Sequence, residues 1–279
     1  MEPTTARRSV AALAAVTYVV MVTVNVLANT LPINGVRTGD VSDAYPNLFA
    51  PAGLTFSIWS VIYLLLGLHV LYQLGLFRGH GSGGDRSALL NKVGLYFSMS
   101  SLANTAWVFA WHYDVIALSV VLIVVILACL AVIATTVAAA DRTAREKLFI
   151  GVPFSVYFGW TTVATVANVT VFLVSIGWDG FGLADSTWAV VILLVAAAIG
   201  TATVLRNRDV AYGLVLLWAY TGILIKHTSA DGFDDRFPLV IATVIACLVI
   251  YVAAIGTTLI RQRRRRAAST VDSQHNPTH

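Results

Sequence analysis

The residues best suited to chemistry in this sequence are uncharged: tryptophans, tyrosines and asparagines at helical spacing within apolar stretches. Residues 49–67 read FAPAGLTFSIWSVIYLLLG and carry Trp59 and Tyr63. Side chains four residues apart lie on one face of a helix, so these two rings would point the same way. Large rings with a polar tip either pack between helices or line a pocket for a flat, largely apolar ligand.

Two later stretches repeat this combination of aromatic and amide side chains. Residues 100–114 read SSLANTAWVFAWHYD, and residues 152–173 read VPFSVYFGWTTVATVANVTVFL. An asparagine surrounded by lipid would leave its amide groups unsatisfied, so it should face another helix or a cavity. The predicted ligand-binding residues of the three stretches are Trp59, Tyr63, Asn104, Trp107, Tyr157, Trp160 and Asn168.

The elements that position these residues are predicted to be membrane-spanning helices. Of the 279 residues, 58% are hydrophobic and 11% are charged, and the mean hydropathy is +0.79. Soluble domains carry about 25% charged residues, and a helix needs roughly 20 apolar residues to cross ~30 Å of hydrocarbon. The expected fold is an all-α, eight-helix transmembrane bundle, with spans at about 10–31, 53–76, 93–111, 115–140, 148–176, 188–205, 210–226 and 238–260.

Counting along these spans places the aromatic and amide residues in one leaflet. At about 1.5 Å per residue, Trp59 lies roughly 9 Å below the outer end of its span. Asn104 and Trp107 lie roughly 6–11 Å below the outer end of theirs, and Asn168 reaches a similar depth. Two interpretations remain open: a shared pocket, or an aromatic belt accompanied by hydrogen bonds between helices.

The charges of the loops predict the orientation of the bundle. Basic residues precede the first span and follow the second, fourth, sixth and eighth, whereas the other loops are mainly acidic. Because Lys and Arg are retained in the cytoplasm, this pattern predicts a multi-pass protein of the plasma (inner) membrane with both termini cytoplasmic. The run RQRRRR at 261–266 would lie at the anionic inner leaflet, so the net charge of +4 does not indicate nucleic-acid binding.

The usual signals for catalysis and metal binding are missing from the sequence. It contains no P-loop, HExxH, CxxC or GxSxG motif. Cys129 and Cys247 both fall inside apolar spans and are interpreted as small buried hydrophobes. No span carries a central Asp, Glu, Arg or Lys, which argues against a proton-coupled transporter. We therefore predict no catalytic residue, no metal and no enzyme activity, and interpret GHGSGG at 79–84 as a flexible loop.

The three aromatic stretches resemble the motifs of the translocator/tryptophan-rich sensory protein (TspO/MBR) family. FAPAGLTFSIWSVIYLLLG resembles its second helix, LANTAWVFAW its third and VPFSVYFGWTTVATVAN its fifth, in the family's order. The likeness covers roughly residues 10–176. The chain departs from the family in having three further spans, and in keeping only Pro46 and Pro51 where the family has tryptophan–proline doublets. It is therefore similar to a divergent, extended member.

The resemblance implies a helical bundle around a pocket that is open towards one leaflet. It implies binding of tetrapyrroles, sterols or isoprenoid lipids in a sensory, regulatory or transport role, with a tetrapyrrole as ligand and no resident cofactor. Six residues would line or shape the pocket by motif position: Trp59, Tyr63, Asn104, Trp107, Trp160 and Asn168. The loop at 32–52 would cover its mouth, with Arg37, Asp40 and Asp43 available to a ligand's polar end.

The chain is accordingly expected to divide into four parts. These are a cytoplasmic N-terminus at 1–9, a five-helix TspO-like region at 10–176, three additional transmembrane helices at 177–260 and a basic, disordered cytoplasmic tail at 261–279. The expected partners are a small hydrophobic or amphipathic ligand and membrane lipids, but no nucleic acid. The additional helices could cover the pocket or form the surface of a homodimer.

Two other functions fit the same residues. A permease for a neutral or amphipathic solute would use spans six to eight to complete a path, with the asparagines as substrate contacts. A membrane enzyme acting on a lipid or pigment would need an acid or base, and only His69, His112 and His227 lie near membrane depths.

Overall fold

The computed structural model describes residues 5–31, 33–77 and 84–275. These residues are mostly helical and contain no strand, which confirms the predicted all-α membrane bundle. The long helices are α1 (Thr5–Thr30), α3 (Ile58–Leu74), α4 (Gly84–His112), α5 (Ile116–Ala139), α7 (Val152–Ser175), α8 (Asp185–Asn207), α9 (Val210–Thr228) and α10 (Pro238–His275). Short helical segments join them: η1 (Ile33–Gly35), α2 (Thr38–Asp43), η2 (Gly53–Ser57), α6 (Ala144–Glu146), the π-helix η3 (Lys147–Gly151) and η4 (Gly180–Gly182).

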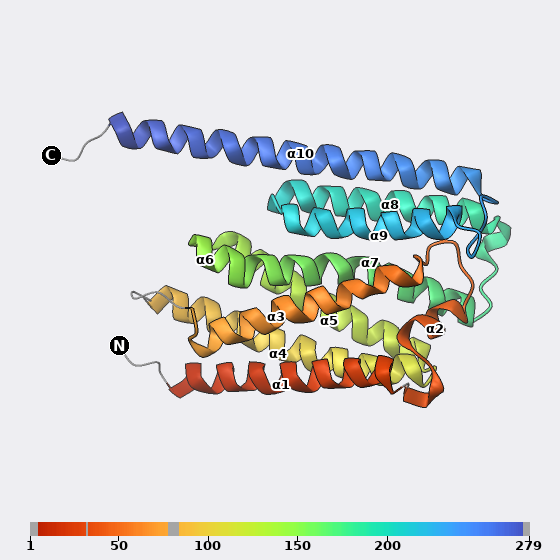
Figure 1. The fold of residues 1–279 in the computed structure, drawn as a ribbon, viewed down its shortest axis with the longest axis horizontal. Helices are drawn as coiled ribbons and strands as arrows, with labels where there is room; N and C mark the ends of the chain where they lie inside the picture. Colours follow the sequence, from red (N-terminus) through yellow and green to blue (C-terminus); the bar gives the residue numbers. More distant parts are fainter. Residues whose placement is uncertain (1–4, 32, 78–83, 276–279) are drawn as a thin grey trace.

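Seven helical segments in the described part of the chain are long and apolar enough to cross a membrane. The third predicted span, 93–111, lies within α4, which is not among the seven. Polar residues lower the hydropathy of this stretch, and four of them, Ser98, Ser100, Ser101 and Asn104, are buried within the bundle. With 29 residues and a place between α1 and α5, α4 belongs to the same bundle (Figure 1).

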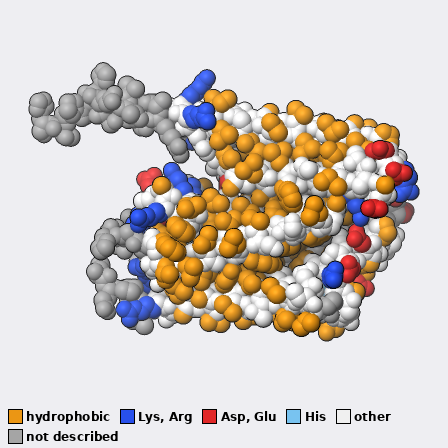
Figure 2. All heavy atoms as spheres, viewed as in Figure 1, with side chains coloured by type: hydrophobic (Ala, Val, Ile, Leu, Met, Phe, Trp, Pro, Cys, Tyr) orange, Lys and Arg blue, Asp and Glu red, His pale blue; other side chains and the backbone are white. Residues whose placement is uncertain are grey.

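The two ends of the bundle carry opposite charge. Lys and Arg side chains gather at one end and Asp and Glu side chains at the other, with a broad apolar surface between them (Figure 2). Large apolar residues such as Val16, Leu64 and Val121 are exposed on this surface, as expected for helices that face lipid. The start of α1 and the end of α10 lie at the basic end (Figure 1).

The long helices form two packed groups. In the first, α4 packs against α1 and α5, α5 packs against α7, and α3 packs against both α1 and α7. In the second, α10 packs against α8 and α9. The groups meet where α9 packs against α7 (Figure 1). Gly159 allows this approach, because a Cβ there would lie 3.0 Å from Cβ of Val215 and 3.2 Å from the carbonyl oxygen of Tyr212.

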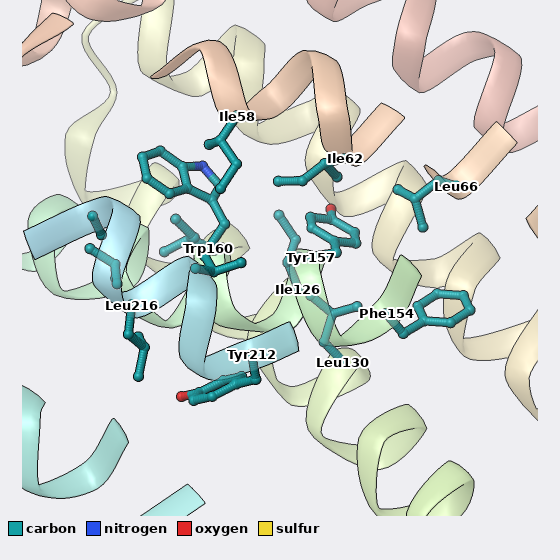
Figure 3. Close-up of a cluster of buried hydrophobic side chains, with 14 of the residues drawn as sticks. Ile58, Ile62, Leu66, Ile126, Leu130, Phe154, Tyr157, Trp160, Tyr212 and Leu216 are labelled. Atoms are coloured by element: carbon teal, nitrogen blue, oxygen red, sulfur yellow. The ribbon is translucent and has the colours of Figure 1, made fainter. Parts of the chain in front are cut away.

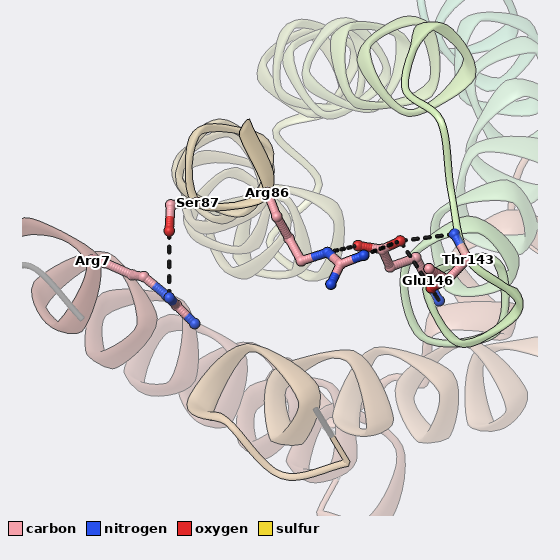
Figure 4. Close-up of polar contacts among 5 residues, drawn as sticks. All are labelled: Arg7, Arg86, Ser87, Thr143 and Glu146. Atoms are coloured by element: carbon pink, nitrogen blue, oxygen red, sulfur yellow. Dashed lines mark hydrogen bonds and ion pairs between the residues drawn. The ribbon is translucent and has the colours of Figure 1, made fainter. Parts of the chain in front are cut away.

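A buried ion pair joins two helices at the basic end (Figure 4). Arg86 of α4 lies with Nε 2.5 Å from Oε1 of Glu146, whose side chain is only 2% exposed. Glu146 Oε2 also accepts hydrogen bonds from the backbone N–H and the hydroxyl of Thr143, at 2.8 and 2.9 Å. These bonds cap the start of α6, so the carboxylate is fully engaged by α4 and its own turn.

The π-helix η3 interrupts a span that was predicted to be continuous. In an α-helix the carbonyl of Phe149 would accept from the N–H of residue 153, but Pro153 has none. His69 of α3 takes the place of the missing N–H donor, because its Nδ1 lies 2.9 Å from the Phe149 carbonyl oxygen. His69 is fully buried, and its Nε2 lies 2.9 Å from the Gln73 amide. The histidine therefore holds α3 against the break in the helix.

The last helix is longer than the predicted span. It continues beyond 260 as far as His275, into the segment where the polar composition predicted a disordered tail. Arg, Gln and Ala in that segment are all favourable helix formers, which explains the continuation. The loop at 79–84 lies largely outside the described residues, and Gly84 begins α4.

Replacing His69 by leucine is expected to lower the free energy of unfolding by about 1–3 kcal/mol, because the buried Phe149 carbonyl loses its donor. The cost should be smaller in a Pro153→Ala background, where residue 153 regains an N–H. Thermal unfolding in detergent of the four combinations measures this coupling. A coupling of zero would show that the carbonyl is not what His69 stabilises.

Replacing Gly222 of α9 by alanine is expected to destabilise the protein by about 1–3 kcal/mol, the range for overpacking. A Cβ at this position would lie 2.7 Å from Cγ2 and 2.8 Å from Cβ of the buried Thr55. Gly256→Ala is the matched control, because nothing lies within 4 Å of its added Cβ. Equal unfolding temperatures for the two variants would contradict the close packing of α9 on η2.

Candidate ligand-binding site

The predicted aromatic residues meet in a small cavity, here called the aromatic cavity, between α3, α4 and α7. Its walls are four indoles and the ring of Phe56, and its polar lining comes from Thr38, Ser42 and Asn168. The four tryptophans are Trp59, Trp107, Trp111 and Trp160. Residues of α2 and of the segment before η2 cover one side, since Thr38, Ser42 and Pro51 line it.

The rings of α3 and α7 pack in an ordered stack. Trp59 lies over Tyr63, with ring centroids 5.6 Å apart and planes 19° from parallel. The edges of Tyr157 and Trp160 meet Trp59 at 6.1 and 6.2 Å. Both α7 rings point towards α3, where they also meet Ile58 and Ile62 (Figure 3). Offset and edge-on contacts of this kind are the favourable geometries for aromatic pairs.

Asn168 orients one wall through a chain of buried hydrogen bonds. The Trp107 Nε1–H donates to Asn168 Oδ1 at 2.8 Å, and Asn168 Nδ2 donates to the Ser119 hydroxyl at 2.8 Å. The Ser119 hydroxyl donates in turn to the Ile116 carbonyl. The chain links α4, α7 and α5. Trp107 also stacks on Trp111 with centroids 5.4 Å apart, so its orientation is fixed on two sides.

Asn104 makes a second buried link. Asn25 of α1 donates to Asn104 Oδ1 at 2.7 Å, and Asn104 Nδ2 donates to the Tyr157 hydroxyl at 3.2 Å. Asn104 therefore joins α1, α4 and α7. It also lines a void of about 10 Å³ beside Trp59 and Trp107, adjacent to the aromatic cavity. The amide groups of Asn104 and Asn168 thus serve as scaffold as well as lining.

Two buried polar atoms beside the site lack a hydrogen-bond partner among the described residues: the indole nitrogen of Trp160 and the hydroxyl of Thr161. Trp160 lines the aromatic cavity and Thr161 lines the adjacent void. Leaving such a group unpaired costs about 1–3 kcal/mol. A ligand or a water that supplied a partner would recover this cost, so these atoms are the polar contacts available in the site.

The segment at 33–52 lies over the site and is tied to the helices on both sides. The Trp111 Nε1–H donates to the Thr38 carbonyl at 3.0 Å, and Asn34 donates to the His112 carbonyl at 2.9 Å. Tyr45 donates to the Asp114 carboxylate at 2.6 Å, and this hydrogen bond raises the pKa of Tyr45 above its ordinary value. The cover is therefore fastened to α4 and the turn that follows it.

The charged residues expected at the mouth are engaged elsewhere. Asp40 accepts from the backbone N–H of Arg37 at 2.9 Å, which caps α2. Asp43 pairs with Lys226 of α9 at 3.2 Å. The segment offers the cavity Thr38 and Ser42 in their place. No periodic pattern in the sequence distinguishes these two residues from the charged residues beside them.

The structure brings most of the predicted site residues together. Trp59, Trp107, Trp160 and Asn168 line the aromatic cavity, and Asn104 lines the adjacent void. Tyr63 and Tyr157 line neither, but both pack against Trp59. Asn25 was not among the predicted residues, although it is an amide inside an apolar run, the same signal that identified Asn104.

The cavity is small in this conformation. Its volume is about 30 Å³, whereas pockets that hold drug-sized ligands have roughly 300–1,000 Å³. A flat ligand as large as a sterol therefore needs the covering segment or the indoles to move. A larger cavity of about 330 Å³ lies further along α7, bounded by Phe49, Leu173 and Trp188.

The three histidines have structural contacts outside the aromatic cavity. His112 Nδ1 lies 2.7 Å from the Val108 carbonyl oxygen, and His227 Nε2 lies 2.9 Å from that of Leu48. His69 bonds to Phe149 as described above. None of the three lines the aromatic cavity, although His112 Nε2 lies 3.4 Å from the hydroxyl of Thr38, which does.

Asn168→Leu is expected to lower the free energy of unfolding by about 1–3 kcal/mol, because Trp107 and Ser119 each lose a buried partner. Hydrogen bonds between membrane helices average only about 0.6 kcal/mol, so the larger cost comes from the groups left unpaired. Thermal unfolding in detergent measures the effect. Thr165→Val on the same helix is the control, since its hydroxyl bonds only to its own helix. A loss as large in the control would contradict the network.

Comparison with known proteins agrees with this geometry. A search of curated proteins and a search of solved structures found no significant match. A family model described as TSPO-like protein matches residues 11–257. The match extends beyond the motifs at 49–168 and includes α8, α9 and more than half of α10. Because it covers most of the sequence, the chain belongs to the TSPO-like protein family.

Proposed function

We propose that this protein is a membrane receptor for a flat, largely apolar ligand of the tetrapyrrole, sterol or isoprenoid class, with a sensory, regulatory or transport role. The observation that carries the proposal is the convergence of four indoles from α3, α4 and α7 on one cavity. Aromatic faces bind flat rings by stacking and edge contacts. The membership in the TSPO-like family supports a ligand-binding role of this general kind.

The unpaired donors give the site its polar preference. The Trp160 indole nitrogen and the Thr161 hydroxyl are buried without a partner. A ligand with one or two acceptor atoms, such as a carboxylate, a keto group or a hydroxyl, would satisfy them. The two asparagine amides are already hydrogen-bonded within the protein. The site therefore recognises shape first and a few polar atoms second.

Ligand access in this proposal runs beneath the segment at 46–51. That segment lies between the aromatic cavity, which includes Pro51, and the larger cavity of about 330 Å³, which includes Pro46 and Phe49. Both cavities lie along α7, one at Ala167 and the other at Thr170. Displacing the segment would join them into a volume suitable for a ring system. In this proposal the acidic end of the bundle faces outward, and the basic end faces the cytoplasm.

Titration of the purified protein with protoporphyrin IX should quench tryptophan fluorescence saturably. Trp59→Ala should raise the dissociation constant about three- to tenfold, since an aromatic contact contributes about 0.5–1.5 kcal/mol beyond burial. Phe109→Ala is the control, because that ring is 44% exposed and lines neither cavity. Absence of saturation with porphyrin, sterol and isoprenoid alike would refute the proposal. Uptake of the ligand into proteoliposomes down its gradient would assign the transport role.

A further inference from the structure

A second polar site lies at the opposite end of the bundle from the aromatic cavity. A cavity of about 260 Å³ opens at the basic end, between α5, the start of α7, the α8–α9 turn and α10. It is called the basic-end cavity below. Three cationic side chains line it, Arg142, Lys147 and Arg208, together with the amide of Gln262. No part of the proposed receptor function uses these residues.

The cations of this cavity have no internal partner in the described part of the chain. The ion pairs recorded there join Arg86 to Glu146 and Lys226 to Asp43, and neither includes Arg142, Lys147 or Arg208. Figure 4 shows the Arg86 guanidinium paired with Glu146 through two of its nitrogens. One carboxylate, Asp209, also lines the cavity. Three positive charges therefore face one negative charge.

The Asp209 carboxylate accepts two hydrogen bonds within the protein. It accepts from the Tyr212 backbone N–H at 3.1 Å, which caps α9, and it accepts a short hydrogen bond from the Ser155 hydroxyl. Its negative charge lies at the N-terminus of α9, where it interacts favourably with the helix dipole. The three cations outnumber this one carboxylate, so the cavity carries an excess of positive charge.

The backbone makes room for the Arg142 guanidinium. The π-helix η3 ends at Gly151, and a Cβ there would lie 2.9 Å from Arg142 Nη1. Only glycine allows the guanidinium to lie this close to the helix. The Arg142 Nε is buried and has no hydrogen-bond acceptor. A buried guanidinium N–H without an acceptor is costly, so the site is built for a group that supplies one.

The cavity also has an apolar wall. Val137 of α5, and Val152 and Phe154 of α7, line it beside the cations. Its place at the charged end of an apolar bundle corresponds to the headgroup region of a membrane (Figure 2). A ligand that fits has an anionic, oxygen-rich head and an apolar body. Phosphate oxygens accept paired hydrogen bonds from arginine and contact lysine as a point charge.

We propose that the basic-end cavity binds a phosphate group, held by Arg142, Lys147 and Arg208. Two sources have this chemistry: the headgroup of an anionic membrane lipid and free inorganic phosphate. The apolar wall favours the lipid. The proposal is independent of the aromatic cavity, because the two sites share no lining residue.

Isothermal titration calorimetry of the full chain in uncharged detergent tests the proposal with three probes. These are dioctanoylphosphatidic acid, inorganic phosphate and dioctanoylglycerol. We expect saturable binding of the phosphatidic acid and none of dioctanoylglycerol. Phosphate that binds much more weakly than the phosphatidic acid identifies a lipid site, and phosphate that binds equally well identifies a site for free phosphate. Failure of the phosphatidic acid to saturate, or equal binding of dioctanoylglycerol, overturns the proposal.

The double variant Arg142→Gln/Lys147→Gln should weaken phosphatidic acid binding by about tenfold or more, because two charge-assisted contacts are lost. Arg145→Gln/Arg206→Gln is the matched control, since it removes two exposed charges that do not line the cavity. Its affinity should stay within about twofold of the parent, because charges that do not line the cavity act only through the screened field. An equal loss in both double variants would indicate general charge attraction and overturn the site.

Gly151→Ala provides a test that leaves the charge unchanged. The added methyl group meets only the far end of a flexible side chain, so the helix should fold while the Arg142 guanidinium is displaced. Weakened binding in a variant with an unchanged circular dichroism spectrum supports the site even where the double variant does not fold. Unchanged binding in Gly151→Ala would show that the position of Arg142 is irrelevant and would overturn the proposal.

Discussion

The structure depends on one constraint: most polar groups inside a membrane bundle must find their partners within the protein. Water is absent from the hydrocarbon region, so an amide or indole N–H left unpaired there is costly. Two chains of hydrogen bonds meet this constraint. One runs from Asn25 through Asn104 to Tyr157, and the other runs from Trp107 through Asn168 to Ser119. Together they join α1, α4, α5 and α7.

These chains explain why scaffold and site coincide. The hydrogen bond from Trp107 to Asn168 holds one indole against the cavity, and the bond from Asn104 to Tyr157 positions a ring that packs against Trp59. Substituting either asparagine therefore changes helix packing and cavity shape together. Trp59 and Trp160 differ from Trp107, because their rings contact other rings and their nitrogens make no recorded hydrogen bond. They contribute to the fold through the packing of their rings and not through a hydrogen bond between helices.

Much of the fold could be predicted from the sequence, because the membrane imposes length and hydropathy on each helix. The identity of the amide partners could not. Asn29 and Asn25 are both asparagines of α1, yet only Asn25 reaches Asn104, while Asn29 bonds to its own helix. One helical turn separates them, and spacing alone does not say which faces a neighbour. Pro153 indicates a break in the helix near η3. The side chain that bonds to the freed Phe149 carbonyl is His69 of another helix, which only the tertiary structure identifies.

The size of the cavity and its cover were also beyond the sequence, since both depend on how a loop settles on the bundle. The segment at 33–52 has no hydrophobic period that indicates its contacts. Thr38 and Ser42 face the indoles, whereas Asp40 and Asp43 are taken by a helix cap and an ion pair. Charged residues near the predicted mouth of the pocket were expected to contact a ligand. A helix cap and an ion pair within the protein instead satisfy these carboxylates, at a lower cost in free energy than leaving them unpaired.

The additional helices have a specific structural connection to the site. Helix α9 contacts η2 directly: the Trp218 Nε1–H donates to the Thr55 carbonyl at 2.9 Å, and the Ala52 N–H donates to the Gly222 carbonyl at 3.0 Å. The segment η2 carries Phe56 and leads into Trp59, two walls of the cavity. A shift of α9 would therefore move these walls without any ligand contact of its own. Since α9 also begins at the turn that lines the basic-end cavity, the same helix contacts the walls of one cavity and forms part of the lining of the other.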